Sequence, residues 1–233
     1  GYGTPRELYS YVYDQSLALL VAIGANDRAM ADKLVHGLSA IQVKTGEQKG
    51  AFPASAHQLD YTGIQQPIYY TGGIAFVQYA LISYMEKYGD QQGVRQMILD
   101  TFRWLETMKT TTGDAAGLFR GGVRIDNGIK KDIAWHATEH NTDMWHVYER
   151  AARVLGDKQY AQKADELAKV TVAKLWNTSE GRFNQGYDDS SKALDTTSWG
   201  SIFLNAIGEY DKAKQALAHT AIYKTTDGAA KGY

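Results

Sequence analysis

The sequence predicts an all-α fold built from antiparallel helical hairpins that repeat along the chain. This prediction rests on two short glycine-containing segments, here called marks, which recur together along the chain. The first mark recurs at steps of 65, 67 and 52 residues, at Gly24, Gly89, Gly156 and Gly208. The second follows about 25 residues later, at steps of 67, 64 and 51 residues, at Gly50, Gly117, Gly181 and Gly232. Because the two marks move in step, they delimit one unit that occurs four times, as in a helical array or toroid.

The first hairpin is predicted at residues 13–41. A helix over about residues 13–23 ends at Gly24, and Asn26 or Asp27 caps the next helix. Apolar residues at helical spacing give the first helix one stripe, made of Leu17, Leu20 and Val21. They give the second helix another, made of Met30, Leu34, Leu38 and Ile41. We expect both stripes to face the core.

The other three hairpins follow the same plan. Their helices are predicted, in chain order, at residues 71–88, 94–105, 138–155, 158–176, 196–207 and 211–219. No segment with strand periodicity has a useful length. Turns within a hairpin are short, whereas the connections between hairpins are long, at residues 43–70, 111–137 and 177–195. The first helices of all hairpins therefore begin at one loop-rich end, where we expect a binding face.

Composition excludes several functions. The chain has 233 residues, 44% hydrophobic and 22% charged, with a formal net charge of −1. It offers no basic surface for nucleic acid and no run of about 18 apolar residues for a membrane span. Cysteine is absent, so no disulfide or thiolate chemistry is expected. No phosphate-binding glycine motif is present, and we expect no cofactor.

Four carboxylates at the loop-rich end are candidate catalytic groups: Glu139, Asp143, Asp14 and Asp195. Glu139 and Asp143 lie one helical turn apart, so their charges repel, which raises the pKa of at least one of them in a partly buried site. A carboxyl kept protonated in this way can act as a general acid. The alternative is helix capping, with Thr138 as the N-cap and the acids in the first turns of their helices.

Aromatic and polar side chains at the same end are candidate substrate-binding groups. They are Tyr13, Gln15, Tyr70, Trp135, His136, His140, Asn141 and Trp199, with the loop residues Asp60, Tyr61, Gln65 and Gln66 beside them. Tyrosine and tryptophan combine an apolar face with a polar edge, as sugar binding requires. His136 and His140 have a spacing that could share a metal ion, but the order of the motif is wrong and no third ligand is obvious. We expect hydrogen bonding or stacking from them and no metal.

The chain resembles the six-hairpin glycosidase-like superfamily, whose members form (α/α)₆ toroids. The similarity lies in residues 13–19 (YDQSLAL), 138–143 (TEHNTD), 181–184 (GRFN) and 194–200 (LDTTSWG). It implies a funnel that binds poly- or oligosaccharides, and hydrolysis by a carboxylate pair. The family has six hairpins and this chain four. We therefore expect residues 1–233 to be a single-domain fragment of a larger ring. Missing hairpins or self-association would cover its open edge.

The resemblance implies a glycoside hydrolase, extracellular or periplasmic, with a poly- or oligosaccharide as its partner. Glu139 would be the general acid, Asp14 or Asp195 its partner carboxylate, and Asp143 would tune Glu139 and hold the substrate. A polysaccharide lyase or sugar epimerase is an alternative, using His136 or His140 with a tyrosine. The lyase version predicts a basic residue such as Arg120 or Arg124 in the funnel. A non-catalytic glycan- or protein-binding module is the third interpretation.

Overall fold

The chain folds as a series of antiparallel helical hairpins, as expected. The computed structural model describes residues 9–57, 67–227 and 230–232, and the loop candidates Asp60, Tyr61, Gln65 and Gln66 lie outside them. Within the described residues, eight α-helices form four pairs: α1 (Val12–Gly24) with α2 (Arg28–Ile41), α3 (Thr71–Tyr88) with α4 (Val94–Glu106), α5 (Thr138–Leu155) with α6 (Lys158–Leu175), and α7 (Leu194–Ala206) with α8 (Tyr210–His219). A short 3₁₀ helix, η2 (Thr220–Tyr223), follows α8. The all-α class is confirmed.

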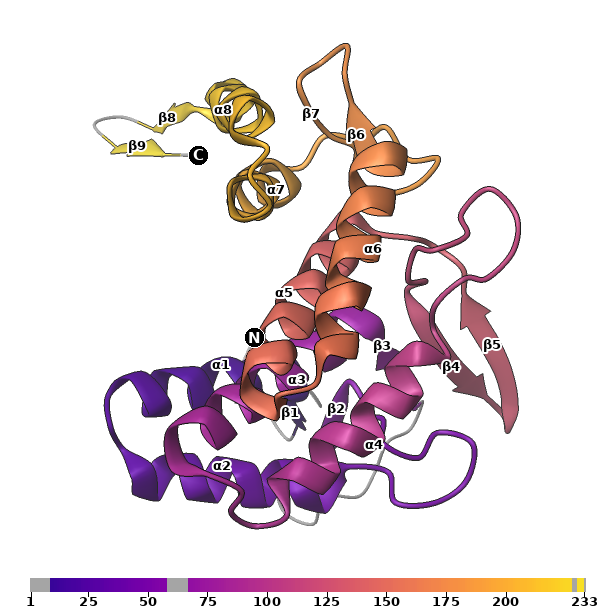
Figure 1. Cartoon of the computed structure of the whole chain (residues 1–233), viewed down its shortest axis with the longest axis vertical. Helices are drawn as coiled ribbons and strands as arrows, with labels where there is room; N and C mark the ends of the chain where they lie inside the picture. The colour runs from indigo at the N-terminus through magenta and orange to yellow at the C-terminus, as the bar shows by residue number, and fades with distance from the viewer. Residues whose placement is uncertain (1–8, 58–66, 228–229, 233) are drawn as a thin grey trace.

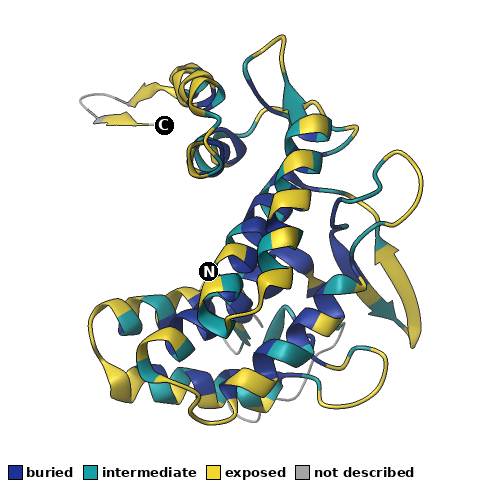
Figure 2. Cartoon of the chain, in the orientation of Figure 1, coloured by how far each residue is buried: buried dark blue, intermediate teal, exposed yellow. Residues whose placement is uncertain are grey.

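The odd-numbered helices form one continuous row. α1 packs on α3, α3 on α5 and α5 on α7, while each even-numbered helix packs on the preceding odd-numbered one. In Figure 1 the row runs from α1 and α2 at the bottom to α7 and α8 at the top. α3 and α5 have more buried residues than the other helices (Figure 2), because these two helices have a neighbour in the row on both sides.

Short strands occupy the long connections, where the sequence pattern predicted none of useful length. β1 (Tyr9–Tyr11) pairs with β2 (Ser55–His57), and β6 (Trp176–Asn177) pairs with β7 (Arg182–Phe183). β3 (Ile68–Tyr70), β4 (Gly122–Asp126) and β5 (Ile129–Ile133) form a three-stranded antiparallel sheet. β8 (Thr225–Asp227) and β9 (Ala230–Gly232) form a last hairpin.

One backbone hydrogen bond recurs at the start of three odd-numbered helices. The first residue of each helix donates its N–H to a carbonyl in the loop of the next hairpin. These bonds run from Val12 to Ala54 at 3.1 Å, from Thr71 to Gly121 at 3.0 Å and from Thr138 to Gln185 at 3.0 Å. Each acceptor lies four residues after a glycine of the second mark, Gly50, Gly117 or Gly181. We call it the inter-repeat hydrogen bond.

The inter-repeat hydrogen bond corrects the expected N-cap of α5. The N-cap residue is Ala137, and Thr138 is the first helical residue. The hydroxyl of Thr138 donates to the carbonyl of Asn184 at 2.6 Å, and the hydroxyl of Thr71 donates to Arg120 at 2.7 Å in the same manner. Both threonines therefore bind the next loop instead of capping their own helix.

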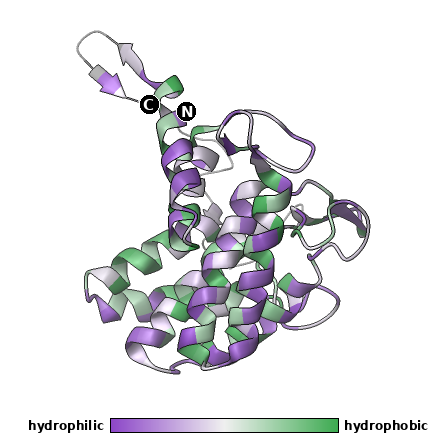
Figure 3. Cartoon of the chain, turned by 45° about the horizontal axis from the view of Figure 1, so that its top comes forward, coloured by the Kyte–Doolittle hydropathy of each residue, from purple (hydrophilic) through white to green (hydrophobic). Residues whose placement is uncertain are grey.

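The apolar stripe predicted for α1 faces the core only in part. Leu20 packs against the core, whereas Leu17, which is 37% exposed, and Val21, which is 71% exposed, do not; the buried residues of the helix include Val12 and Leu19. α1 lies at the end of the row, where its main helix neighbours are α2 and α3, and apolar residues continue onto its uncovered side, as the hydropathy view in Figure 3 illustrates. Met30 of α2 is also exposed, at 46%.

Gly50 should be indispensable for stability. It has φ +90°, and an added Cβ would overlap the carbonyl oxygen of Asp100. We expect Gly50→Ala to lower the free energy of unfolding by about 3 kcal/mol, combining left-handed strain with overpacking. Gly46→Ala is the matched control, since Gly46 has φ +76° and open space where a Cβ would lie; it should cost about 1 kcal/mol. Equal losses in urea unfolding would contradict the packing argument.

Candidate active site

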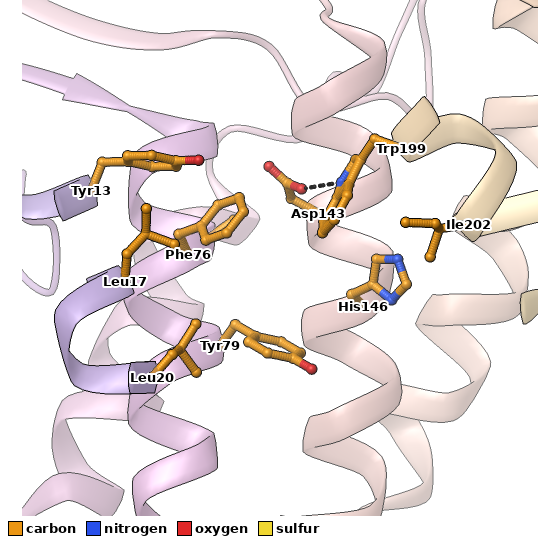
Figure 4. A pocket seen from close by; sticks show the side chains of 10 residues that line it. Tyr13, Leu17, Leu20, Phe76, Tyr79, Asp143, His146, Trp199 and Ile202 are labelled. Carbon is orange, nitrogen blue, oxygen red and sulfur yellow. Dashed lines mark hydrogen bonds between the residues drawn. The ribbon is translucent and has the colours of Figure 1, made fainter. Parts of the chain in front are cut away.

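The odd-numbered helices place the same three positions in three layers, of which the lower two line a shared cavity. These are the second, sixth and ninth residues of each helix, which lie on one face because they are spaced by four and three. They form an upper layer of Tyr13, Gly72, Glu139 and Asp195. Below it lie a middle layer of Leu17, Phe76, Asp143 and Trp199 and a lower layer of Leu20, Tyr79, His146 and Ile202. The middle and lower layers, with Tyr13 and Ala75, line a cavity of about 520 Å³ (Figure 4).

Asp143 is the most deeply buried carboxylate of the site, with 4% of its surface exposed. Its Oδ1 accepts a hydrogen bond of 2.7 Å from the indole Nε1 of Trp199, and its Oδ2 has no hydrogen-bond partner. Burial, and then the charge of Glu139, raise the pKa of Asp143 well above its usual range, against the opposing effect of the Trp199 bond. This carboxyl is therefore suited to being neutral.

Glu139 and Asp195 come together in the upper layer. Glu139 is half-buried, and burial followed by the charge of Asp195 raises its pKa. Asp195 is exposed, and its Oδ1 accepts a hydrogen bond of 2.7 Å from the N–H of Thr196. Tyr13 faces the same group: burial, then Glu139, Asp143 and Asp14 raise the pKa of its hydroxyl. One site thus holds a carboxyl with a raised pKa next to an exposed carboxylate.

Aromatic rings from three helices cross the cavity. Tyr13 of α1 meets Phe76 of α3 edge-on, with ring centroids 4.8 Å apart, and Phe76 stacks on Trp199 of α7 at 6.2 Å. Trp199 also lies 5.7 Å from the ring of His146. Figure 4 shows these rings on opposite sides of the cavity. Such a surface can stack against the apolar face of a sugar ring.

Two histidines of α5 are neutral at physiological pH. Burial lowers the pKa of His140 to about 4 and that of His146 to about 4. Gly72 makes room for His140, because a Cβ at that position would overlap the imidazole ring. His140 Nδ1 and His146 Nε2 are buried without a hydrogen-bond partner. His146, and not His140, lines the cavity.

Three expected substrate-binding residues are already engaged within the protein. His136 Nε2 lies 2.7 Å from the hydroxyl of Thr110, and Gln15 donates to Ser10 at 2.6 Å. The amide of Asn141 is buried, accepts from the N–H of Phe119 and donates to the carbonyls of Phe119 and Ala137. Asn141 therefore joins a loop to α5, and a contact of Asn141 with substrate stays a prediction.

Tyr70 and Trp135 remain candidates at the edge of the site. They are 42% and 41% exposed, and Tyr70 immediately precedes α3. The ring of Trp135 lies 6.1 Å from that of His140 and close above Gly186. Sugar stacking on these two rings stays a prediction.

Sequence reasoning missed Phe76 in the middle layer and Tyr79 and His146 in the lower layer. Their spacing is the signal that could have found them: Phe76 follows Gly72 by four residues, as Trp199 follows Asp195, while Tyr79 and His146 follow Gly72 and Glu139 by seven. Four and seven residues keep a helical position on the same face. Among the residues that line the cavity, none of those described is arginine or lysine. Arg124 instead pairs with Asp126 at 3.0 Å, and Arg120 with Asp132 at 3.5 Å.

Neither a metal cluster nor a membrane span occurs among the described residues. No group of three or more His, Asp or Glu side chains in that part of the chain is arranged to hold a metal ion. No helix there is both long and apolar enough to cross a membrane.

The chain is similar in fold to solved structures of sugar-modifying enzymes. A cellobiose 2-epimerase from Bacillus thermoamylovorans B4167 matches with a TM-score of 0.72 at 12% identity, over 97% of this chain and 63% of its own. A D-mannose isomerase matches with a TM-score of 0.65 at 13% identity, over 90% and 58%. Rex8A from Paenibacillus barcinonensis, complexed with xylose, matches with a TM-score of 0.60 at 14% identity, over 85% and 57%. No protein-family model and no curated protein matches the sequence.

These likenesses establish the fold. The protein is an (α/α) toroid built of helical hairpins, and it spans less than two thirds of the length of those structures. The fold of antiparallel helical hairpins that the resemblance implied is thereby confirmed.

The neutral His140 should make stability depend on pH. Its folded pKa of about 4 lies below the ~6.5 of an unfolded histidine. As the pH falls from 6.5 toward 4, the unfolded chain therefore binds a proton that the folded chain does not, and stability is lost. Between pH 7 and pH 5, His140 should account for a loss of about 2 kcal/mol.

Urea unfolding at these two pH values tests this expectation. His140→Gln should show a pH-dependent loss about 2 kcal/mol smaller than the wild type. His36→Gln, which removes an exposed imidazole of α2, is the matched control. Identical pH dependence in His140→Gln and the wild type would contradict a neutral His140.

Proposed function

We propose that the protein is a carbohydrate-active enzyme that hydrolyses glycosidic bonds in an oligo- or polysaccharide. The observation that carries this proposal is the pairing of Glu139 with Asp195 above an aromatic cavity. Burial and Asp195 raise the pKa of Glu139, while Asp195 is exposed to solvent. Two carboxyl groups with different environments are the acid and base set that glycoside hydrolysis uses.

The roles follow from the environment of each group. Glu139, kept protonated, donates its proton to the glycosidic oxygen as the bond to the anomeric carbon breaks. Asp195 either takes a proton from the attacking water or attacks the anomeric carbon itself, and the separation of the two carboxyl groups selects between these routes. Asp195 is preferred to Asp14 as the partner because Asp195 raises the pKa of Glu139 and shares a helical face with Trp199.

A sugar epimerase is the second candidate, and the histidines favour it. His146 is neutral and lines the cavity, so its imidazole could remove a proton from carbon. Cellobiose 2-epimerase and D-mannose isomerase are also among the structures of similar fold. A lyase that acts on uronic acids is disfavoured, because no described cavity-lining residue offers an arginine or lysine for the substrate carboxylate.

Replacement of Glu139 tests the acid role. We expect Glu139→Gln to lower kcat for release of reducing sugar by about 10²–10⁴-fold, as loss of a general acid does. In the wild type, kcat/KM should fall as the pH rises through the raised pKa of Glu139, because the acid then loses its proton. The substrate panel is xylan, β-glucan and mannan. A Glu139→Gln variant with unchanged turnover would contradict the acid role of Glu139, whereas sugar binding without turnover in both proteins would favour a binding module.

Two further measurements separate the alternatives. Asp195→Asn should lose hydrolysis, whereas Asp14→Asn, which alters an exposed acid beside the same site, should retain it. Incubation of cellobiose in D₂O separates the reactions, because epimerisation through a carbanion exchanges a carbon-bound hydrogen for deuterium and hydrolysis does not. Deuterium on carbon without release of glucose would overturn hydrolysis in favour of epimerisation.

A further inference from the structure

Two buried polar atoms of the cavity have no hydrogen-bond partner among the described residues. They are Oδ2 of Asp143 and Nε2 of His146. Both residues belong to α5, one turn apart, and both line the cavity. Because a buried polar atom without a hydrogen bond costs free energy, such atoms at the wall of a cavity indicate a ligand that supplies the missing bonds.

The hydrogen bond from Trp199 decides where Asp143 can carry a proton. Trp199 Nε1 donates to Oδ1 at 2.7 Å, so a proton on the carboxyl must lie on Oδ2. Figure 4 shows this second oxygen pointing away from Trp199 toward the side of the cavity that Tyr13 and Phe76 form. In the neutral acid, Oδ2 is a hydrogen-bond donor aimed into the cavity.

The surroundings of Asp143 favour the neutral acid. The ionisable groups around it are Glu139 and His146 on its own helix and Tyr13 on α1, with Asp195 of α7 beyond Glu139. Phe76 is the middle-layer residue that α3 contributes, and it brings no charge. No described cavity-lining lysine or arginine neutralises a carboxylate here, so burial of the ionised form would be uncompensated.

We propose that Asp143 and His146 form a subsite that binds hydroxyl groups of a sugar in this cavity. The Oδ2–H of Asp143 donates to one hydroxyl oxygen on the side of Tyr13 and Phe76, and Nε2 of His146 bonds to another hydroxyl, since a hydroxyl both donates and accepts. Phe76 and Trp199 supply the ring-stacking surface beside these groups. Asp143 is thus a positioning residue for the sugar. The inference rests on the proposed sugar ligand but not on hydrolysis.

Binding in a Glu139→Gln background tests the subsite without turnover. The probes are cellobiose, xylobiose and mannobiose, measured by isothermal titration calorimetry. Asp143→Asn keeps an acceptor for Trp199 and a donor for the sugar, so the Kd of the best-bound probe should stay within about threefold. Asp143→Leu has a similar size but no donor and should bind about tenfold more weakly. His146→Gln should likewise bind more tightly than His146→Phe.

Two results would overturn the subsite. One is equal loss of binding in Asp143→Asn and Asp143→Leu, which would mean that a carboxylate charge is required. The other is that none of the three probes binds. If the protein proves not to hydrolyse glycosides, but Asp143→Asn still binds sugar more tightly than Asp143→Leu, the proposed hydrolysis is contradicted and the subsite is supported.

The protonation of Asp143 can be measured without any ligand. In protein labelled with ¹³C at the aspartate carboxyl, the resonance that disappears in Asp143→Asn belongs to Asp143. We expect its chemical shift to be that of a neutral acid and constant from pH 5 to pH 7. A resonance that titrates near pH 4, as an ordinary aspartate does, would contradict the donor role. Unfolding in urea shows whether each variant still folds.

Discussion

The inter-repeat hydrogen bond is the constraint on which the site depends. It ties the first N–H of an odd-numbered helix to the loop of the next hairpin, at Val12, Thr71 and Thr138. Because α1, α3 and α5 start at matching contacts, their second, sixth and ninth residues reach the same depths. The acceptor loops follow glycines with positive φ, including Gly50 and Gly117. A backbone turn at these glycines therefore positions the loop that holds the start of each of these helices, and with it the upper layer.

The layered arrangement explains how one cavity holds carboxyl groups of different character. In the upper layer Asp195 meets solvent and Glu139 is half-buried, whereas one turn lower Asp143 is closed in by Phe76 and Trp199. Desolvation raises the pKa of both carboxyl groups, and a like charge adds to it, from Glu139 at Asp143 and from Asp195 at Glu139. In order of increasing depth, the same scaffold therefore offers Asp195 as an exposed carboxylate, Glu139 as an acid and Asp143 as a neutral hydrogen-bond donor.

The sequence predicted the fold more fully than the site. Repeated glycine marks located the hairpins, and the bounds of α3 and α5 match the predicted 71–88 and 138–155. The buried face of α1 was harder to predict, since Leu17 is exposed toward the cavity and Val21 is exposed on the surface. The β4–β5 hairpin was missed although Asn127-Gly128, with φ of 50° and 78°, is a typical hairpin turn. The lower cavity, including His146, requires knowing which helical face turns inward, and periodicity alone does not give that direction.

The central claim is that a sugar ring binds between the odd-numbered helices with its scissile bond at Glu139. A crystal structure of the Glu139→Gln variant with xylotriose or cellotriose tests it most directly. We predict a sugar ring flanked by Phe76 and Trp199, with a glycosidic oxygen about 3 Å from the residue-139 side chain. A sugar bound elsewhere on the surface, or a cavity left empty at saturating sugar, would contradict it.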